Sequence, residues 1–244
     1  MIIRKWNDLP SEMQTDAIRP YYEILKAKQL SLIIKRLFDI LASALLLVLL
    51  SPLFLLLAIA IKLDSPGPVF YRQTRITQYG RHFRIFKFRS MVQNADHGAQ
   101  VTVNKDTRIT RVGRIIRKYR LDEISQLIDV FRGTMTFVGT RPEVPAYVSA
   151  YTPEMMATLL LPAGVTSLAS ICYKDEALLL DAAADPEKVY IEEILPHKMI
   201  YNLRAICTFT LHGDLKIMIM TLLAVCGMQF DSSRLAQEEF SNVQ

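Results

Sequence analysis

The apolar stretch ILASALLLVLLSPLFLLLAIAI, which runs from Ile40 to Ile61, decides the fold of this chain. It is 22 residues long and carries no charge, as is typical of a membrane-spanning helix. Ser51-Pro52 interrupts it at the midpoint. Proline kinks or ends a helix, because it lacks a backbone donor and clashes with the preceding turn. The stretch therefore predicts a membrane segment with a broken centre.

Both flanks of this stretch are basic. Lys35 and Arg36 precede it and Lys62 follows it, so both ends prefer the cytoplasmic side of a membrane. A segment with a broken middle and two cytoplasmic ends can enter one leaflet and return to the same side. The alternative is a kinked helix that crosses the membrane, because proline is tolerated in transmembrane helices. The residues alone leave both alternatives open.

The remaining composition is that of a cytoplasmic domain. The 244 residues suffice for one or two domains with a sizeable core. No other stretch is long and apolar enough to span a membrane, and this one is too internal for a secretory signal peptide. Three widely spaced cysteines without metal-ligand spacing predict reduced thiols, at Cys172, Cys207 and Cys226.

The net charge of +5 conceals a strong asymmetry. Residues 62–120 carry 14 Lys and Arg but only 3 Asp, whereas residues 121–244 carry 8 Lys and Arg and 16 Asp and Glu. Because the basic block follows the apolar stretch directly, it suits anionic lipid headgroups or phosphate-bearing substrates. We expect no nucleic-acid partner, since no known nucleic-acid-binding module is present.

The patterning predicts an α+β protein that is mostly helical, with a small β element. Strands are expected at 69–71 and 83–88, with a turn near Gly80 and a polar loop at 92–107. Helices are expected at 110–118, from Leu121 to a stop at Gly133, and at 144–160, 176–181, 186–204 and 214–226. A turn at 162–166 and a strand at 167–173 complete this assignment.

Asp122 and Glu123 stand at the expected start of the helix after Leu121. Acidic residues there commonly just complement the helix dipole. The context favours a phosphate site, because four basic residues lie just upstream, at Arg114, Arg117, Lys118 and Arg120. Adjacent helical side chains point about 100° apart, so the two carboxylates do not face each other as a glycosidase pair. One carboxylate can act as nucleophile or metal ligand, and Mg²⁺ at a phosphate site usually takes one or two carboxylates plus substrate phosphates.

Arginine recurs at every third position from Arg108 to Arg120. A spacing of three does not keep to one helical face, so only some of these side chains converge on one site. Guanidinium groups suit phosphate oxygens. The alternative is a solvated helix face.

Lys87 and Arg89 share one face of the expected second strand, and Phe86 and Phe88 share the other. The two cations are candidate phosphate ligands, and the alternative is an ordinary amphipathic edge strand. No P-loop, dinucleotide fingerprint, zincin motif or nucleophile elbow is present. The scattered histidines are interpreted as structural or surface residues: His82, His97, His197 and His212.

Taken in order, these pieces resemble the bacterial sugar transferase family, the monotopic polyprenol-phosphate phosphoglycosyl transferases. The match covers about residues 33–225. The matching residues are Lys35-Arg36-Leu37-Phe38-Asp39, Ser51-Pro52, Ile61-Lys62-Leu63, Ser65-Pro66-Gly67-Pro68-Val69-Phe70-Tyr71-Arg72-Gln73, Lys87-Phe88-Arg89-Ser90-Met91, Arg108-Ile109-Thr110-Arg111-Val112-Gly113, Leu121-Asp122-Glu123 with Gln126-Leu127, and Val138-Gly139 with Arg141-Pro142.

The resemblance implies an activity. Members transfer a sugar 1-phosphate from a UDP-sugar to a polyprenol (undecaprenyl) phosphate, release UMP, require Mg²⁺, and initiate a bacterial surface glycan. By position, Asp122 is the implied nucleophile that forms a covalent phosphosugar intermediate, with Glu123 as its partner, and Asp122 is also the candidate metal ligand. Arg117 and Arg141 are implied phosphate binders. Ser51-Pro52 is implied to make a re-entrant helix hairpin.

Four positions depart from the family pattern. Gly-Pro-Arg-Pro is Gly139-Thr140-Arg141-Pro142 here, and Gly-Asp-Met is Gly133-Thr134-Met135. Pro-Gly-Ile-Thr-Gly is Pro162-Ala163-Gly164-Val165-Thr166-Ser167, with an extra residue, and Arg120 replaces the usual small residue before Leu-Asp-Glu. The catalytic pair survives, so we expect activity, but the choice of sugar stays open.

The expected organisation has four segments: an N-terminal peripheral arm (1–34), a re-entrant membrane helix (35–63), a cytoplasmic phosphoglycosyl transferase domain (64–229) and a C-terminal tail (230–244). Amphipathic surface helices are expected to assist anchoring. With only a short arm before the first motif, the chain resembles the small form of the family. It is expected in contact with membrane lipid at the cytoplasmic face of the bacterial inner membrane, and a homodimer is left open.

Two other functions compete with this interpretation. One is direct transfer through a ternary complex in which Asp122 only holds the metal. The other is a non-catalytic, membrane-bound regulator that has kept the fold.

Overall fold

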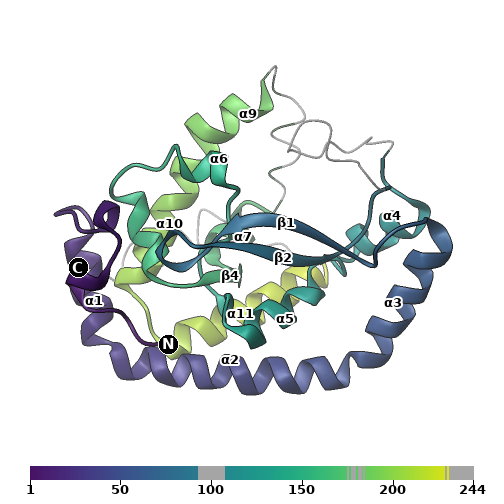
Figure 1. Cartoon of the computed structure of the whole chain (residues 1–244), viewed down its shortest axis with the longest axis horizontal. Helices are drawn as coiled ribbons and strands as arrows, with labels where there is room; N and C mark the ends of the chain where they lie inside the picture. The colour runs from purple at the N-terminus through teal and green to yellow at the C-terminus, as the bar shows by residue number, and fades with distance from the viewer. Residues whose placement is uncertain are drawn as a thin grey trace.

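The computed structural model describes residues 1–92, 108–174, 176, 180, 183, 185–228 and 230. A long helix, α2 (Gln29–Leu49), runs along one edge of the molecule, and α3 (Ser51–Asp64) turns away from its end (Figure 1). Helices dominate and the strands are few, which confirms the predicted α+β class. The predicted loop at 92–107, helix at 176–181 and C-terminal tail lie almost entirely outside the described residues, as does His97.

The predicted break at Ser51-Pro52 is a bend of 60° between α2 and α3. Pro52 lies in the first turn of α3, where a backbone N–H has no helical partner to lose. The Ser51 hydroxyl donates to the Val48 carbonyl at 2.8 Å. In the described part of the chain, no single helix is long and apolar enough to cross a membrane, whereas α2 and α3 together reach the required length and composition.

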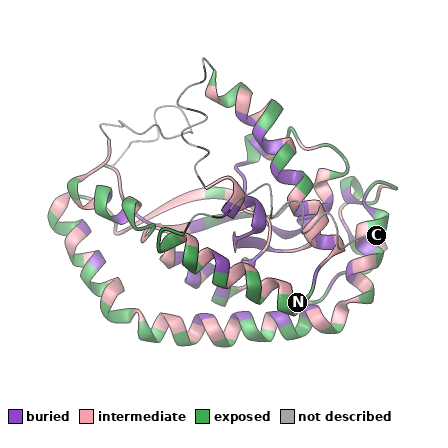
Figure 2. Cartoon of the chain, turned by 180° about the vertical axis from the view of Figure 1, so that it is seen from behind, coloured by how far each residue is buried: buried purple, intermediate pink, exposed green. Residues whose placement is uncertain are grey.

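Both helices expose large apolar side chains along their outer side (Figure 2). On α2 these include Leu41, Leu45 and Val48, and on α3 they include Leu55 and Ile59. A contiguous apolar surface of this kind marks a contact with membrane or protein. Whether the pair re-enters one leaflet stays a prediction.

Two charged side chains attach the first half of α2 to the domain. Lys35 is buried and forms an ion pair with Asp214 on α11 (Leu211–Val225). Asp39 is also buried, and it accepts a hydrogen bond from the Thr136 hydroxyl at 2.7 Å. Its second carboxylate oxygen lies 3.3 Å from the backbone nitrogen of Phe137.

Arg36 makes a third attachment, to the end of α5 (Leu127–Arg132). Its two terminal nitrogens donate to the carbonyls of Val130 at 2.7 Å and Phe131 at 3.0 Å. The helix ends at Gly133, whose φ of 86° is the left-handed conformation that glycine tolerates best. The predicted stop at Gly133 is confirmed.

The β structure consists of two separate pairs of strands. β1 (Phe70–Ile76) and β2 (His82–Phe88) form an antiparallel hairpin with Gln73 opposite Ile85, and the chain turns at Gly80 as predicted. β3 (Met135–Val138) pairs in parallel with β4 (Ala163–Thr166).

The assignment around Ser167 is wrong. The expected turn at 162–166 is β4, and the expected strand at 167–173 is helix α7 (Leu168–Cys172). The Ser167 hydroxyl accepts from the Ser170 backbone N–H at 3.0 Å, which is a helix N-cap. Apolar residues alternate poorly over this short segment, so the cap, not the periodicity, was the informative signal.

The N-terminal segment is part of the domain core and not a detached arm. Its buried side chains include Ile3, Met13, Ile18 and Leu25, and they pack with Phe209 and other domain residues.

The other elements are α1 (Arg19–Ala27), α4 (Arg111–Lys118), α6 (Pro145–Val148), α9 (Pro186–Val189), α10 (Leu195–Cys207), a π-helical turn (Tyr190–Ile194), and 3₁₀ turns at Trp6–Asp8, Ser11–Met13, Gln78–Gly80, Ile124–Gln126 and Met155–Leu160. The predicted helices at 110–118, 186–204 and 214–226 are confirmed, and the one at 144–160 is interrupted between α6 and the Met155–Leu160 turn.

Candidate active site

Asp122 and Glu123 lie in a turn between α4 and the 3₁₀ turn Ile124–Gln126, and not in the first turn of a helix as expected. Helix α4 ends when the Leu121 N–H bonds the Ile116 carbonyl at 2.8 Å and the Arg120 N–H bonds that of Arg117 at 3.1 Å. This pattern is a Schellman motif, and it places Arg120 at φ 52°. The left-handed position explains why a small residue is usual there.

The turn is fixed to the end of β2. The Phe88 N–H donates to the Asp122 carbonyl at 3.0 Å. The Ser125 hydroxyl, fully buried, donates to the Phe86 carbonyl at 3.0 Å. Strand β2 thereby brings Lys87 beside the acidic pair.

Glu123 is the centre of a charged cluster. Its Oε1 lies 2.5 Å from Arg141 and 3.2 Å from the Lys87 ammonium, and its Oε2 lies 3.4 Å from Arg141. Burial alone raises the pKa of Glu123, but the charges of Arg141 and Lys87 outweigh it and hold the pKa well below its ordinary value. Glu123 is therefore ionised and fully engaged in positioning two cations.

Asp122 differs from its neighbour. In the residues that the structure describes, its carboxylate has no side-chain hydrogen-bond partner. Burial raises the pKa of Asp122, the adjacent charge of Glu123 raises it further, and Lys87 and Arg117 oppose both effects. A half-buried carboxylate with a raised pKa, which among the described residues is bonded only by its own backbone N–H, is typical of a reactive group.

The arginines of α4 divide into two groups. Arg117 is half-buried and close enough to Asp122 to lower its pKa, whereas Arg111 and Arg114 are exposed. Helix α4 itself is fixed at its start by Thr110, whose hydroxyl accepts from the Gly113 N–H at 2.9 Å. Arg111 and Arg114 therefore belong to a solvated face of α4, whereas Arg117 lies next to the candidate site.

Of the four predicted phosphate ligands, Arg89 is the one whose side chain lies away from the acidic pair, against the end of α3. It is only 5% exposed, and its guanidinium donates to the carbonyls of Ser65 at 2.7 Å and Pro66 at 2.8 Å, at the end of α3. Strand β2 ends at Phe88, so Arg89 leaves the face that carries Lys87. The prediction that Arg89 binds phosphate is therefore corrected to a structural contact with α3.

Sequence reasoning missed a second cluster behind Arg141. Glu143 is buried and accepts a hydrogen bond from the Tyr190 hydroxyl at 2.6 Å, with Lys198 3.9 Å away. Arg75 lies 4.0 Å from Glu143 and donates to the Pro142 carbonyl at 3.1 Å. Arg75 could have been found by alternation, because Tyr71 opposes Lys87 in the hairpin and Arg75 shares that face.

The donor set suits a metal that is held mainly by substrate. Within the described ranges, no group of three or more His, Cys, Asp or Glu is arranged to hold a metal ion. Glu123 is occupied by Arg141 and Lys87, which leaves Asp122 as the carboxylate of the pair that is available. Mg²⁺ binding through one carboxylate plus substrate phosphates fits this arrangement.

Comparison with known proteins identifies the family of this chain. A family model described as bacterial sugar transferase matches residues 30–228. The chain belongs to the bacterial sugar transferase family. This match includes α2, α3, the Asp122–Glu123 turn and both strand pairs.

Relatives of this chain are named for different sugars. The chain is 39% identical over 164 residues to the UDP-N-acetylgalactosamine-undecaprenyl-phosphate N-acetylgalactosaminephosphotransferase of Aeromonas hydrophila, covering 66% of this chain and 36% of the relative. It is 34% identical to the UDP-glucose:undecaprenyl-phosphate glucose-1-phosphate transferase of Xanthomonas campestris pv. campestris (68% and 33% coverage). It is 39% identical to the protein of that same name from Caulobacter vibrioides (66% and 57% coverage). The chain thus spans between 33% and 57% of the length of these relatives.

Proposed function

We propose that this protein is a phosphoglycosyl transferase that moves a sugar 1-phosphate from a UDP-sugar to undecaprenyl phosphate and releases UMP. The relatives named above act on these two substrate classes. One observation carries the proposal: Asp122 has a raised pKa and no side-chain partner in the described residues, beside a Glu123 that holds two cations. The product would be the first lipid-linked intermediate of a bacterial surface glycan.

In the proposed mechanism, an Asp122 carboxylate oxygen attacks the sugar-bearing phosphorus. The bond from this phosphorus to the bridging oxygen breaks, and UMP leaves with that oxygen and the electron pair. An oxygen of undecaprenyl phosphate then attacks the same phosphorus, and the Asp122 carboxylate is regenerated. Two negative reactants approach a carboxylate, so fixed positive charge must stabilise both steps.

The cations of the site supply that charge. Arg141 and Lys87 are held by Glu123, so they are oriented before substrate arrives. Arg117, on α4, lies close enough to Asp122 to lower its pKa, and from there it can bind a phosphate oxygen. Asp122 and the substrate phosphates would hold Mg²⁺, which when bound offsets phosphate charge.

Release of UMP without an acceptor tests the covalent route. Purified protein mixed with a UDP-sugar and no lipid should release UMP in an amount equal to the enzyme, and the peptide containing Asp122 should gain the mass of the sugar phosphate. Asp122→Asn should abolish both signals. Glu123→Gln should only slow them, because that carboxylate orients cations and does not attack.

Two results separate this route from the alternatives. If UMP appears only after undecaprenyl phosphate is added, direct transfer through a ternary complex replaces the covalent route. If no UDP-sugar in a broad panel yields UMP with or without lipid, the protein is a non-catalytic member of the family.

We also propose that α2 and α3 form a re-entrant hairpin at the cytoplasmic face of the inner membrane. The 60° bend and the exposed apolar side of both helices support this topology. In a variant whose native cysteines are replaced, single cysteines at the exposed positions Arg4 and Lys62 should resist an impermeant thiol reagent until cells are lysed. Labelling of only one of them before lysis would mean a spanning helix.

A further inference from the structure

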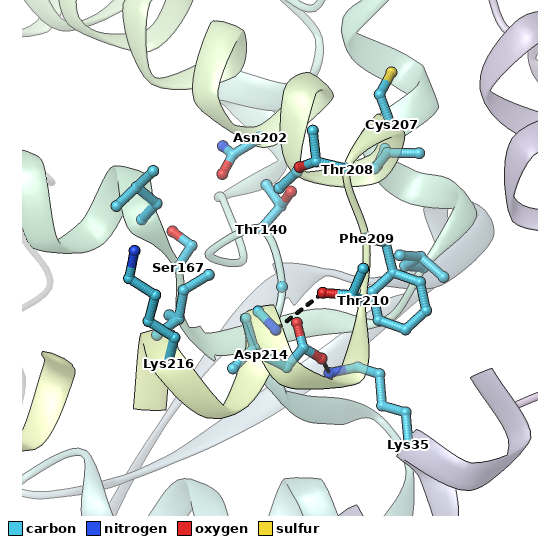
Figure 3. Close-up of a pocket in the computed structure, with 18 of the residues that line it drawn as sticks. Lys35, Thr140, Ser167, Asn202, Cys207, Thr208, Phe209, Thr210, Asp214 and Lys216 are labelled. Carbon is cyan, nitrogen blue, oxygen red and sulfur yellow. Dashed lines mark hydrogen bonds and ion pairs between the residues drawn. The ribbon is translucent and has the colours of Figure 1, made fainter. Parts of the chain in front are cut away.

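A cavity of about 540 Å³ borders the loop that carries Arg141 (Figure 3). It is lined by the end of α10, the first turns of α11, the end of β3 with the loop to Thr140, Thr158 and Leu161, the start of α7, and Lys35 from α2. Its size falls in the range of roughly 300–1,000 Å³ that is usual for small-molecule sites. The sequence motifs gave no indication of it, because its wall comes from segments far apart in the chain.

The cavity and the acidic pair share one loop. Thr140 lines the cavity, and the next residue, Arg141, contacts Glu123. Gly139 and Gly164 fix the loop, because the Gly164 N–H donates to the Thr140 carbonyl at 2.8 Å. A Cβ on Gly164 would approach the Gly139 nitrogen to 2.2 Å, so no larger residue fits there.

The wall is rich in neutral polar groups on an apolar background. Threonine and serine hydroxyls line it at Thr140, Thr158, Ser167, Thr208 and Thr210, with the amide of Asn202 and the ring of Phe209. At one end Lys35 and Asp214 neutralise each other, and His212 and Lys216 also border the space. Hydroxyls and an amide beside an aromatic ring suit a neutral, hydroxylated ring better than a lipid tail.

Two of these side chains can bond a ligand. Among the described residues, the Thr140 hydroxyl is assigned no hydrogen bond. Asn202 is only 5% exposed, yet the one contact of its Nδ2 is the Met199 sulfur at 3.7 Å, which is a weak acceptor. Figure 3 shows Asn202 and Thr140 at the same end of the cavity. A buried amide without a good partner is expected to have one when the site is filled.

The cavity also gathers features that set this chain apart. Thr140 stands where the family pattern has proline, and Ser167 stands where it has glycine. Both substitutions place a hydroxyl in the cavity wall. Two of the four departures from the family pattern, at Thr140 and Ser167, therefore lie in the wall of this cavity.

We propose that this cavity binds a neutral hydroxylated ring of the nucleotide sugar, with Thr140 and Asn202 as its hydrogen-bonding residues. The proposal rests on the proposed function for the identity of the ligand. Two rings of a UDP-sugar share this chemistry, the hexose and the uridine, and the experiment distinguishes them.

Equilibrium binding to the full-length protein tests the proposal without requiring turnover. Ala205→Phe fills the cavity from α10, and Thr140→Val removes one hydroxyl while keeping the shape of the side chain. Ala205→Phe should weaken binding of the preferred UDP-sugar at least tenfold, and Thr140→Val should weaken it roughly three- to tenfold, as expected for one lost hydrogen bond. Thr74→Val is the matched control, because Thr74 is exposed on β1, and it should bind normally.

The affinity for UMP identifies the ring. If Ala205→Phe weakens UMP and the UDP-sugar equally, the cavity holds the uridine, and if UMP binding is unchanged, it holds the hexose. Normal affinity of both ligands in folded Thr140→Val and Asn202→Ala variants would overturn the proposal, even if Ala205→Phe does not fold. A wild-type protein that releases UMP while its cavity variants bind normally keeps the proposed function and excludes the cavity. If the cavity variants lose binding but the wild-type protein releases no UMP, the cavity proposal is kept and the proposed function is excluded.

Discussion

The base of α2 (Lys35, Arg36 and Asp39) and the Asp122–Glu123 turn both hold charges away from water, but the two regions differ in how those charges are partnered. At the base of α2 every charge has a fixed partner: Lys35 pairs with Asp214, Arg36 binds the end of α5, and Asp39 bonds Thr136 and Phe137. In the turn, Glu123 is fixed by two cations while Asp122 is not.

The difference indicates which charges are structural and which are chemical. A buried charge without a partner is costly, so a folded protein retains one mainly where function requires it. The charged groups at the base of α2 are paired within the protein and are not available to a substrate. By this comparison the Lys-Arg-Leu-Phe-Asp motif attaches α2 to the domain, and Asp122 is the candidate for the reaction.

After the loss of Asp122 itself, removing a cation beside the turn should have the largest effect on activity. Arg141→Ala and Arg117→Ala should each reduce kcat/KM for UMP release roughly 10- to 100-fold, because a charge-assisted hydrogen bond contributes about 1.5–3 kcal/mol. Arg111→Ala is the matched comparison, since Arg111 is exposed on the same helix as Arg117, and its loss should be smaller. Equal, mild losses at all three positions would mean that the α4 arginines are a solvated face and that Arg141 serves only Glu123.

The same comparison shows what sequence could and could not predict. Local signals were reliable: Gly133 ends α5, and Thr110 begins α4. Three residues of the family motifs, Lys87, Arg141 and Glu123, lie together in one cluster, and their roles stay predictions. The prediction that Asp122 and Glu123 begin a helix was wrong. A Schellman motif at Arg120 ends α4 and places both residues in a turn, and the apolar spacing after Leu121 does not reveal that turn.

Partners that depend on tertiary contacts were beyond the sequence. Arg89 lies two residues from Lys87, yet β2 ends between them at Phe88 and Arg89 bonds the Ser65 carbonyl at the end of α3. Glu143 lies far in sequence from Tyr190 and Lys198, and nothing in the sequence links it to them. The cavity beside Thr140 is of the same kind, since segments far apart in the chain line it.

Breaking a contact at the base of α2 should change stability and leave the chemistry intact. Asp39→Asn should destabilise the protein by about 1–2 kcal/mol, because asparagine keeps only one of the two oxygens that accept from the Thr136 hydroxyl and the Phe137 N–H. Thermal unfolding of the purified protein in detergent measures this, and kcat of the folded fraction should not change. Ser43→Ala is the control on the same helix, since Ser43 bonds only carbonyls of α2, at Asp39 and Ile40. A kcat that falls as much as the Arg141→Ala value would show that the base of α2 is part of the active site.

The pH dependence of UMP release should sharpen the contrast within the turn. Asp122 must be ionised to attack, so the rate should rise as pH rises through the pKa of Asp122, which burial and Glu123 place above the ordinary value for aspartate. Glu123→Gln removes the nearby negative charge and frees Arg141 and Lys87, and both changes lower the pKa of Asp122. The acid limb of the pH–rate profile should therefore move to lower pH in that variant. A limb that stays in place would mean that the observed ionisation belongs to a group other than Asp122.

The smallest expected effect concerns backbone strain, which is present in the turn and absent from the helical base of α2. Arg120 adopts φ 52° at the end of α4, a conformation that costs a non-glycine residue about 1–2 kcal/mol. Arg120→Gly removes that cost and loses an exposed hydrogen bond to the Lys174 carbonyl at 3.1 Å, together with a positive charge near Glu123. The variant should gain about 1 kcal/mol in stability, or about 2–4 °C in Tm for a chain of this size, with UMP release retained. Arg114→Gly is the matched control, because Arg114 lies inside α4, where glycine should cost about 1 kcal/mol instead. A lower Tm in both variants would show that the contact of Arg120 with Lys174 outweighs the strain, and that this arginine holds α7 against the active-site turn.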